Sequence, residues 1–407
     1  MPTIAIVGAS LAGSSAAATL REEGFDGRIV LIGAEPQLPY DRPPLSKNYL
    51  RGVTPFEKTL LRPADFYRER NIEMRLGTMV ARVDVDKRSL AFQSGERLDF
   101  DQLLIATGGR NRRFPIPGID LPGVYDLRTV ADADRIREAM GRGGRAVVVG
   151  MGFIGAEVAA AMRQSGLEVV AVEPFKTPLY RALGEEIGRV IEGLHRDNGV
   201  EMFLDDAVTA FEGAGRVERV VTRNGRRIEC SLAVFGLGIE PAADLVAGTP
   251  VRVDNGIVVD DQSRTNVPGI YAAGDVANHY HPVCGRQMRV EHWQNGVKQG
   301  AAAARSMLGR GQSYDEVHWF WSDQFDANIQ YAGFHTAWDR IVVRGSLSAR
   351  KFLAFYLTEG RVESVVAINQ GRDMRRTFPI IKARGAVDPA RLEDPNVDLR
   401  TLAPATA

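Results

Sequence analysis

Three charged side chains lie on segments that are otherwise stiff or apolar, which makes them the first candidates for chemistry. Arg42 and Lys47 belong to PYDRPPLSK at 39–47, where prolines fix φ and reduce the entropy lost when a loop is held against a ligand. Glu157 belongs to GAEVAAAM, a run of otherwise small and apolar residues. A carboxylate in such a run needs a cationic partner or water, because an unpaired buried charge destabilises the fold. The alternative is that Lys47 is solvated and that Glu157 is stabilised by the dipole at a helix N-terminus.

The elements that must position these side chains begin with a glycine-rich turn near the N-terminus. The segment TIAIVGASLAGSSAAATLREEGFDGRIVLIGAEP predicts a strand, a tight turn at Gly8 and Gly13, a helix and a second strand that ends at Glu35. In such a unit the helix N-terminus binds a pyrophosphate and the acid accepts hydrogen bonds from ribose hydroxyls. Ser10 replaces the usual middle glycine, so its side chain must be small or turned away from the phosphate. The alternative is that the glycines only mark a turn between a strand and a helix.

The same pattern returns, this time complete, in RAVVVGMGFIGAEVAAAMRQSGLEVVAVEP. Gly150, Gly152 and Gly155 follow an apolar strand, a helix begins, and Glu173 ends the next strand. Two such units predict two dinucleotide sites, or one site and a duplicated scaffold.

Three further apolar strands end in small residues or glycines. FDQLLIATGGRNRRFPIPG contains a buried-strand run that stops at Ala106, Thr107 and Gly108, after which charges and prolines mark a crossover. LAVFGLGIEP and GIYAAGDVAN follow later, and the second places Asp275 directly after Gly274. These strands complete the pattern of an α/β fold with parallel sheets.

Composition excludes several classes of function. Lys plus Arg and Asp plus Glu both number 51, so overall charge gives no reason to expect nucleic acid or an anionic membrane as a partner. Cys230 and Cys284 lie far apart, which excludes a disulfide scaffold, a cysteine-ligated cluster and a CxxC redox pair. MPTIAIVGAS enters directly into a strand-like run and no apolar run is long enough to cross a bilayer, so we expect a cytoplasmic protein.

The order of these parts resembles the two-dinucleotide flavoprotein reductases, which bind FAD in the first dinucleotide fold and NAD(P)H in the second. LPYDRPPLSK, LRTVADA and WFWSDQ further resemble the oxygenase-coupled, NADH-dependent ferredoxin reductases. Members of that family pass electrons to a small 2Fe-2S ferredoxin that serves a cytochrome P450 or an aromatic-ring (Rieske) dioxygenase. The similarity runs from the first strand to about Arg384.

The resemblance implies an α/β fold with two Rossmann-like dinucleotide-binding domains and a C-terminal α+β domain. Residues 1–110 and 238–314 would form the FAD-binding domain, 111–237 the NAD-binding domain and 315–407 the C-terminal domain. From about Gln312, short alternating or aromatic strands predict a mixed antiparallel sheet. A helix around RDMRRTFPIIKARGA and a polar tail without fixed structure would follow.

The resemblance also implies what the charged residues do. The stiff loop would be a clamp on FAD, with Arg42 reaching the pyrophosphate through its planar donor fork. Lys47 would lie near N5 of the isoalloxazine, where a cation stabilises the negative charge that arrives with hydride. In similar flavoproteins this glutamate pairs with the clamp lysine, so we expect an ion pair between Lys47 and Glu157, the two residues predicted to be catalytic.

Other predicted contacts are carried over by position. The FAD-binding residues would be Gly8, Ser10, Ala12, Gly13, Glu35, Arg42, Lys47, Val80, Ala106, Thr107, Gly108, Arg128, Gly274, Asp275, Trp293 and Trp321. The NAD-binding residues would be Gly150, Gly152, Phe153, Ile154, Gly155, Glu157, Glu173 and Gly238. For Trp293 a half-buried core position is an equal alternative to a flavin contact.

Glu173 bears on the choice of coenzyme. An acid at the end of that strand accepts hydrogen bonds from the ribose 2′-hydroxyl and repels a 2′-phosphate, which favours NADH. Lys176 and Arg181 weaken this preference unless they are ordinary surface charges, which is the simpler interpretation.

Histidines in NHYHP raise the question of a metal site. His279 and His281 have no nearby cysteine and only Asp275 as an additional acid, so we expect no metal and a pair of loop histidines instead.

A transient ferredoxin partner would need a basic surface near the flavin. Basic residues in and just before the C-terminal domain could supply it: Arg310, Arg340, Arg344, Arg350, Lys351, Arg372, Arg375 and Arg376. The terminal oxygenase would be reached only indirectly. Two alternatives remain, a rubredoxin reductase or other NADH-dependent flavoprotein reductase, and a flavin-binding signalling protein whose partners change on reduction.

Overall fold

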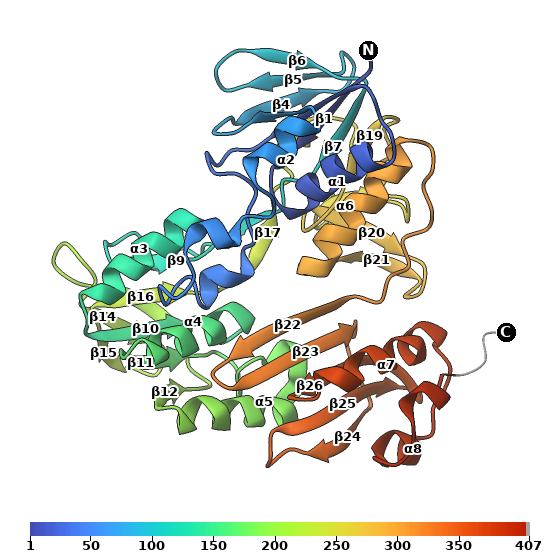
Figure 1. The fold of residues 1–407 in the computed structure, drawn as a ribbon. Helices are drawn as coiled ribbons and strands as arrows, with labels where there is room; N and C mark the ends of the chain where they lie inside the picture. Colours follow the sequence, from blue (N-terminus) through green and yellow to red (C-terminus); the bar gives the residue numbers. More distant parts are fainter. Residues whose placement is uncertain (404–407) are drawn as a thin grey trace. The chain divides into compact units, whose positions relative to one another are not determined.

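The computed structural model describes residues 1–403, which divide into two compact units, each assembled from segments that are distant in the sequence. Unit 1 consists of Met1–Asp41, Glu57–Arg110 and Ile239–His318. Unit 2 consists of Arg42–Phe56, Asn111–Gly238 and the described part of the chain from Trp319 onward (Figure 1).

Unit 1 is built around a parallel sheet with the strand order β19-β7-β1-β2-β3. Its strands are β1 (Thr3–Val7), β2 (Arg28–Ile32), β3 (Ile72–Arg75), β7 (Gln102–Ile105) and β19 (Ile270–Ala272). The central strands are almost continuously apolar because both faces of a parallel sheet are covered. Helices α1 (Leu11–Glu22) and α6 (Trp293–Met307) pack closely together. A Cβ at Gly300 of α6 would lie 2.3 Å from the Ala12 carbonyl oxygen, so this approach requires glycine.

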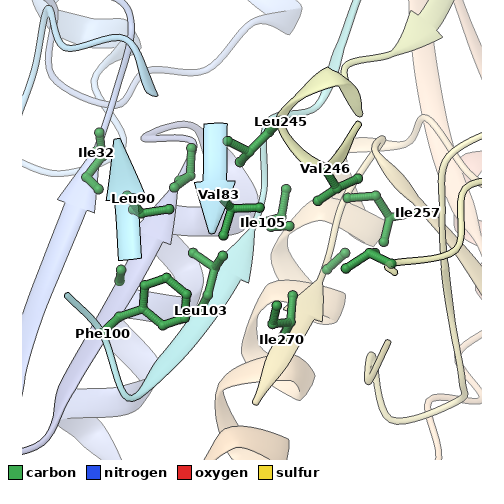
Figure 2. Packing of buried hydrophobic residues seen from close by; sticks show 14 of the residues in the cluster. Ile32, Val83, Leu90, Phe100, Leu103, Ile105, Leu245, Val246, Ile257 and Ile270 are labelled. Atoms are coloured by element: carbon green, nitrogen blue, oxygen red, sulfur yellow. The ribbon is translucent and has the colours of Figure 1, made fainter. Parts of the chain in front are cut away.

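Smaller sheets complete unit 1. Strands β4 (Val80–Asp84), β5 (Ser89–Phe92) and β6 (Arg97–Asp99) form one antiparallel sheet, and β18 (Ile257–Val259), β20 (Ala277–His281) and β21 (Arg286–Arg289) form another sheet. The short helices are α2 (Ala64–Glu69) and η3 (Asp244–Val246). Figure 2 shows the apolar core in which Leu90, Leu103, Leu245 and Ile257 interlock from these elements.

Unit 2 contains a second parallel sheet with the strand order β12-β11-β10-β16-β9. Its strands are β9 (Val124–Asp126), β10 (Arg145–Val149), β11 (Glu168–Val172), β12 (Val200–Phe203) and β16 (Leu232–Phe235). The helices are α3 (Val130–Gly141), α4 (Phe153–Gln164) and α5 (Tyr180–Asp197). An antiparallel sheet of β13 (Val208–Glu212), β14 (Arg219–Thr222) and β15 (Arg227–Glu229) accompanies them.

The C-terminal part of unit 2 is the expected antiparallel sheet, with the order β22-β23-β26-β25-β24. Its strands are β22 (Trp319–Gln324), β23 (Ala327–Gly333), β24 (Arg340–Ser346), β25 (Lys351–Thr358) and β26 (Arg361–Ile368), followed by α7 (Gly371–Ala383). Ile187 and Ile191 of α5 share one buried cluster with Phe352 and Ile368 of this sheet. Helix α5 and the C-terminal sheet are therefore joined by a common core.

The prediction of a structureless polar tail was wrong for the described residues. The segment after α7 forms α8 (Pro389–Glu393) and η4 (Leu399–Thr401). Leu392, Leu399 and Leu402 are buried there. Arg344 also donates hydrogen bonds to the carbonyls of Pro395 and Val397. The leucines spaced along this polar segment were the signal of ordered structure that sequence reasoning missed. Residues 404–407 lie outside the described part.

Short elements lie where the chain passes between the units. Strand β8 (Gly109–Asn111) pairs with β17 (Ile239–Pro241). The loop predicted to be a clamp contains the 3-10 helix η1 (Pro43–Ser46), and η2 (Phe56–Thr59) follows it. Prolines at the start of η1 suit its first turn because their missing N–H groups have no helical partner there.

Candidate functional site

The turn between β1 and α1 has no space for side chains at two glycines. Gly8 has φ of +119°, and a Cβ there would lie 2.0 Å from the Ala106 carbonyl oxygen. A Cβ at Gly13 would lie 2.0 Å from the Gly8 carbonyl oxygen. Ser10 precedes α1 in an extended conformation and its side chain makes no capping hydrogen bond. The first-turn N–H groups of α1 are thus available to an anion, which fits the predicted pyrophosphate turn.

Gly274 places the acid that follows it, Asp275, at the same end of α1. Gly274 follows β19 with φ of +79°, and a Cβ there would lie 3.0 Å from the Cβ of Ala12. Its N–H group donates a 2.8 Å hydrogen bond to Oε1 of Gln299, which is buried in α6. The next residue is the half-buried Asp275. Unit 1 therefore places Asp275 beside the N-terminal turn of α1.

Glu35 lies half-buried just beyond β2, where the first dinucleotide pattern predicts a ribose-binding acid. The hydroxyl of buried Tyr40 donates a hydrogen bond to its carboxylate. The neighbouring Asp41 accepts a 2.7 Å hydrogen bond from Nε1 of Trp293, and burial raises the pKa of Asp41. The indole N–H of Trp293 is thus used by the protein, which agrees with the alternative of a partly buried structural position.

The other predicted FAD contacts of unit 1 lie at strand ends. Thr107 donates a 2.7 Å hydrogen bond from its hydroxyl to the Ala242 carbonyl, and Gly108 has φ of +70°. Val80 begins β4 and is half-buried. Nothing in these contacts by itself identifies a ligand.

The turn between β10 and α4 in unit 2 repeats the packing of the first turn. Gly150 has φ of +87°, and a Cβ at Gly155 would lie 1.9 Å from the Gly150 carbonyl oxygen. Phe153 packs edge-on against Phe320, with ring centroids 4.8 Å apart. Ile154, by contrast, is 47% exposed in the first turn of the helix.

Gly152 differs from these glycines because the described protein gives no reason for it. A Cβ there would meet no atom within 4 Å. Its φ is −69°, which any residue adopts. Gly238 is equally unobstructed, although its φ of +83° favours glycine. A glycine without a packing or conformational cause, at the N-terminus of a helix, fits close approach by a ligand backbone or phosphate.

Glu173 is almost fully buried at the end of β11. Its carboxylate accepts hydrogen bonds from the backbone N–H of Met151 at 2.5 Å and of Phe175 at 3.0 Å. Burial raises the pKa of Glu173, and these two N–H donors oppose that shift. The nearby cations have other partners: Lys176 forms a 3.4 Å ion pair with Glu185, and Arg181 lies over the ring of Phe175.

Unit 2 contains the expected ion pair. Nζ of Lys47 lies 2.7 Å from Oε2 of Glu157, whose side chain is only 3% exposed. The hydroxyl of Ser46 donates to the same oxygen, and the hydroxyl of Ser322 donates to Oε1 at 2.6 Å. Both carboxylate oxygens are therefore hydrogen-bonded, which makes the burial of this charge tolerable.

The hydrogen-bonded chain continues beyond Glu157. Nε2 of Gln324 donates to the Ser322 hydroxyl at 3.1 Å, and Oε1 of Gln324 lies 3.0 Å from Nε2 of His195. Burial lowers the pKa of His195 to about 4, so its imidazole is neutral at neutral pH. Sequence reasoning missed Ser46, Ser322, Gln324 and His195. Alternation within WFWSDQ was the available signal, because Ser322 and Gln324 face inward on β22 and are fully buried.

Three further predicted FAD contacts, Arg42, Arg128 and Trp321, lie in unit 2. Arg42 donates a hydrogen bond to the carbonyl of Arg128, so these two predicted positions meet. Trp321 is half-buried on β22 and stacks on Trp319 with ring centroids 5.6 Å apart. Trp321 alternates with Ser322 along the strand, so the two side chains point to opposite faces of the sheet.

Neither cysteine has the features of a redox-active thiol. Cys230 and Cys284 form no disulfide, and both are half-buried. Burial raises the pKa of Cys230 to about 12, which disfavours the reactive thiolate. The residues around Lys47 in the clamp loop include no cysteine.

Several of the predicted basic surface residues are already paired within their own unit. Arg310 pairs with Glu23 in unit 1. In unit 2, Arg350 pairs with Asp197 and Arg376 with Asp373. Arg340, Lys351, Arg372 and Arg375 are exposed. The basic surface stays a prediction.

The prediction of a loop histidine pair was wrong. His279 and His281 lie on β20, and both are buried. His318, distant in the sequence, joins them. Strand alternation places residues two apart on one face, which the pattern His-Tyr-His already contained.

Taken together, two parallel sheets with pyrophosphate-type turns, a buried lysine–glutamate pair and a C-terminal antiparallel sheet define the class of two-dinucleotide oxidoreductases. Residues 2–300 match the family described as Pyridine nucleotide-disulphide oxidoreductase, and residues 319–403 match Reductase C-terminal. The chain belongs to the pyridine nucleotide-disulphide oxidoreductase family. The expected fold class is thereby confirmed.

Full-length relatives narrow the class. The chain is 38% identical to rhodocoxin reductase of Rhodococcus erythropolis over 399 residues, 98% of this chain and 93% of the relative. It is 39% identical over 399 residues to the anthranilate 1,2-dioxygenase system ferredoxin–NAD(+) reductase component of Burkholderia cepacia, covering 98% of both. The resemblance drawn from the sequence is thus confirmed.

Solved structures of reductases have the same fold as this chain. The ferredoxin reductase for the CYP199A2 system from Rhodopseudomonas palustris superposes with a TM-score of 0.95 at 34% identity, over 99% of this chain and 100% of the other. The reductase in a covalent putidaredoxin reductase–putidaredoxin complex superposes with a TM-score of 0.94 at 34% identity, over 98% and 97%. No helix among residues 1–403 combines the length and apolar character needed to span a membrane.

Proposed function

We propose that this chain is an FAD-dependent NADH:ferredoxin reductase whose 2Fe-2S ferredoxin serves a cytochrome P450 or a Rieske dioxygenase. The enzyme class, a ferredoxin–NAD(+) reductase, is that of its full-length relatives. The structural observation that carries the proposal is the buried Lys47–Glu157 pair with its hydroxyl donors. We assign 1–110 and 238–314 to FAD binding, 111–237 to NADH binding and 315–407 to the C-terminal domain.

Residues of unit 1 would hold FAD. The N–H groups at Ser10, Ala12 and Gly13 would bind the pyrophosphate, since the α1 N-terminus carries no acid in its first turn. Glu35, fixed by Tyr40, would accept ribose hydroxyls, and Asp275 would accept hydroxyls further along the cofactor. Bound FAD would supply the redox chemistry itself, accepting a hydride from NADH and releasing electrons singly to the iron–sulfur partner.

Lys47 would act as an electrostatic catalyst at the reacting ring. Glu157 holds the ammonium group in one place, and the hydroxyls of Ser46 and Ser322 hold Glu157. A cation fixed before the reaction stabilises negative charge without a reorganisation cost. The ion pair also compensates the charge of Lys47 in its half-buried position, because an uncompensated buried ammonium is strongly disfavoured.

NADH would bind at the second turn. Gly152 leaves room for the pyrophosphate, and buried Glu173 would accept the ribose 2′-hydroxyl and repel a 2′-phosphate. The partners already held by Lys176 and Arg181 support the preference for NADH, since neither is reserved for a phosphate.

The partner would be a small ferredoxin that docks transiently. Relatives include a reductase crystallised in a covalent complex with putidaredoxin. Exposed basic residues such as Arg340, Lys351 and Arg372 could contribute to a salt-sensitive contact with an acidic partner. A rubredoxin partner remains the alternative for the same chemistry, and a redox-switched signalling protein the alternative from another class.

One experiment tests the electron path. The purified protein is mixed anaerobically with NADH, and separately with NADPH, while its visible spectrum is followed; oxidised 2Fe-2S ferredoxin or rubredoxin is then added. We expect rapid bleaching of the flavin bands by NADH and prompt reoxidation by ferredoxin. Reoxidation by rubredoxin alone would support the alternative reductase, a long-lived reduced complex would support the signalling protein, and a preparation without flavin would contradict the proposal.

A variant tests the assigned catalyst. Lys47→Ala should slow anaerobic flavin reduction by NADH by about tenfold or more while FAD content stays close to that of the unmodified protein. Lys47→Arg should recover part of the rate because it retains the charge. Lys58→Ala removes an exposed lysine of η2 and is the matched control. Unchanged reduction kinetics in Lys47→Ala would contradict the role of Lys47 without affecting the ferredoxin assignment.

A further inference from the structure

Three imidazoles meet inside unit 1, on residues to which no role was assigned above. His279 and His281 lie two residues apart on β20 and therefore share one face of the strand. His318 ends the segment that leads from α6 to the end of unit 1. One nitrogen from each ring can be chosen so that all three lie within 4.8 Å of one another, and all three residues are buried.

Two of these rings have unsatisfied hydrogen-bonding capacity. Among the described residues, neither ring nitrogen of His279 and neither of His318 has a hydrogen-bond partner. Their side chains are 1% and 3% exposed, so bulk water does not replace the missing partners. Buried polar groups without partners are rare, because each one costs the free energy of its lost hydration. Finding them together in one cluster points to a shared ligand.

The third ring is already oriented as a ligand would be. Nε2 of His281 lies 3.0 Å from the carbonyl oxygen of Glu316, which can only accept, so Nε2 carries the hydrogen. The lone pair is then on Nδ1, which accepts a 3.3 Å hydrogen bond from the Cys284 N–H; a bound ion would take the place of this contact. Histidine ligands of metal ions characteristically donate their other N–H to a backbone carbonyl in this way.

The composition of the cluster suits a cation that accepts nitrogen ligands. Neutral imidazole is the form that coordinates metals. The cluster has imidazole nitrogens and no carboxylate, which favours Zn²⁺ or a neighbouring transition metal over Mg²⁺ or Ca²⁺.

We propose that His279, His281 and His318 form a buried site for a divalent transition-metal ion, with Zn²⁺ as the expected occupant. Tetrahedral coordination at about 2.0–2.1 Å would draw the ring nitrogens closer together than they are here, and water would supply the fourth ligand. The ion would connect β20 to the segment that follows α6. Its role would thus be to stabilise unit 1, separate from hydride transfer.

The test uses the tag-free holoenzyme, because an affinity tag made of histidines would bind the same ions. The protein is treated with EDTA, equilibrated with Zn²⁺, separated from free ion by gel filtration and analysed for metal content. We expect about one tightly held Zn²⁺ per chain and a higher melting temperature with Zn²⁺ than with Mg²⁺. Co²⁺ should give visible absorption bands at longer wavelength than the oxidised flavin bands, which Zn²⁺ then abolishes.

Variants assign the ion to these residues. His279→Phe and His318→Phe should each weaken Zn²⁺ retention by about tenfold or more. His195→Phe removes an equally buried histidine from unit 2 and should retain the ion. Should a phenylalanine variant fail to fold, His318→Gln and the Co²⁺ spectrum of the unmodified chain replace it. Absence of retained Zn²⁺ in the unmodified protein would overturn the proposal. So would Zn²⁺ retention in both cluster variants equal to that of the unmodified protein.

Discussion

The two glycine turns of this chain agree where the protein packs against itself and differ where a ligand would lie. In both turns the last glycine of the pattern, Gly13 or Gly155, is required because a Cβ would lie within 2.0 Å of the backbone of the first. At the middle position the first turn has Ser10 and the second has Gly152. Packing thus requires glycine at the last position of both turns. The two turns differ at the middle position, where a Cβ at Gly152 would meet no atom.

The acids that end the two patterns differ in the same sense. Glu35 is half-buried and held by the Tyr40 hydroxyl. Glu173 is 5% exposed and held by two backbone N–H groups. A side-chain hydroxyl thus holds the carboxylate of Glu35, whereas backbone N–H groups of the turn hold that of Glu173. We infer that the second turn discriminates between coenzymes and that the first retains one cofactor.

The largest expected effect concerns packing. Gly155→Ala should lower the free energy of unfolding by about 1–3 kcal/mol or more, because its Cβ would overlap the Gly150 carbonyl. Gly152→Ala should change stability by less than about 0.5 kcal/mol and instead raise KM for NADH. Urea denaturation and steady-state kinetics of the two variants measure this contrast. An equal free energy of unfolding for the two variants would contradict the distinction between Gly155, required by packing, and Gly152, left free for a ligand.

The next effect concerns the acids. Glu173→Gln should lower the ratio of kcat/KM for NADH to kcat/KM for NADPH by about tenfold, because the repulsion of a 2′-phosphate is lost. Glu35→Gln is the matched control in the first turn and should leave that ratio unchanged while weakening FAD retention. An identical ratio in all three proteins would contradict the role of Glu173.

The Glu173→Gln variant also gives a pH test. Burial raises the pKa of Glu173, so the folded chain binds this proton more tightly than the unfolded chain. The free energy of unfolding should therefore fall as pH rises from the unfolded pKa through the raised folded pKa. Glu173→Gln should remove part of this fall. Urea denaturation of the unmodified protein and this variant across the acidic range measures the difference.

The smallest effect concerns the middle position of the first turn. Ser10→Gly should change FAD retention by less than about twofold, because the Ser10 hydroxyl makes no capping hydrogen bond and the backbone N–H is retained. Equilibrium dialysis of the apoprotein with FAD provides the comparison. A large gain in affinity would show that the serine side chain obstructs the cofactor.

The sequence predicted what local patterns encode. Gly8, Gly13, Gly150 and Gly155 lie at the turns for the steric reasons that the motif supplies. The Lys47–Glu157 pair joins distant segments, and it was expected because similar flavoproteins contain it.

What the sequence did not reveal depends on distant segments meeting. Ser322, which donates to Glu157, comes from β22, and His318 joins a strand that lies earlier in the chain. No spacing in one segment indicates such meetings. The buried leucines after α7 were also missed, because their polar neighbours dominate the composition of the segment.

The core shared by α5 and the C-terminal sheet also limits how this protein could evolve. Ile187, Ile191 and Phe352 are fully buried in one cluster, although the two family matches divide the sequence between residues 300 and 319. A gene fusion at that division would keep the apolar residues of α5 without the strands that cover them. Recombination with an unrelated C-terminal segment would therefore succeed only if its strands matched α5, and the two halves are expected to diverge together.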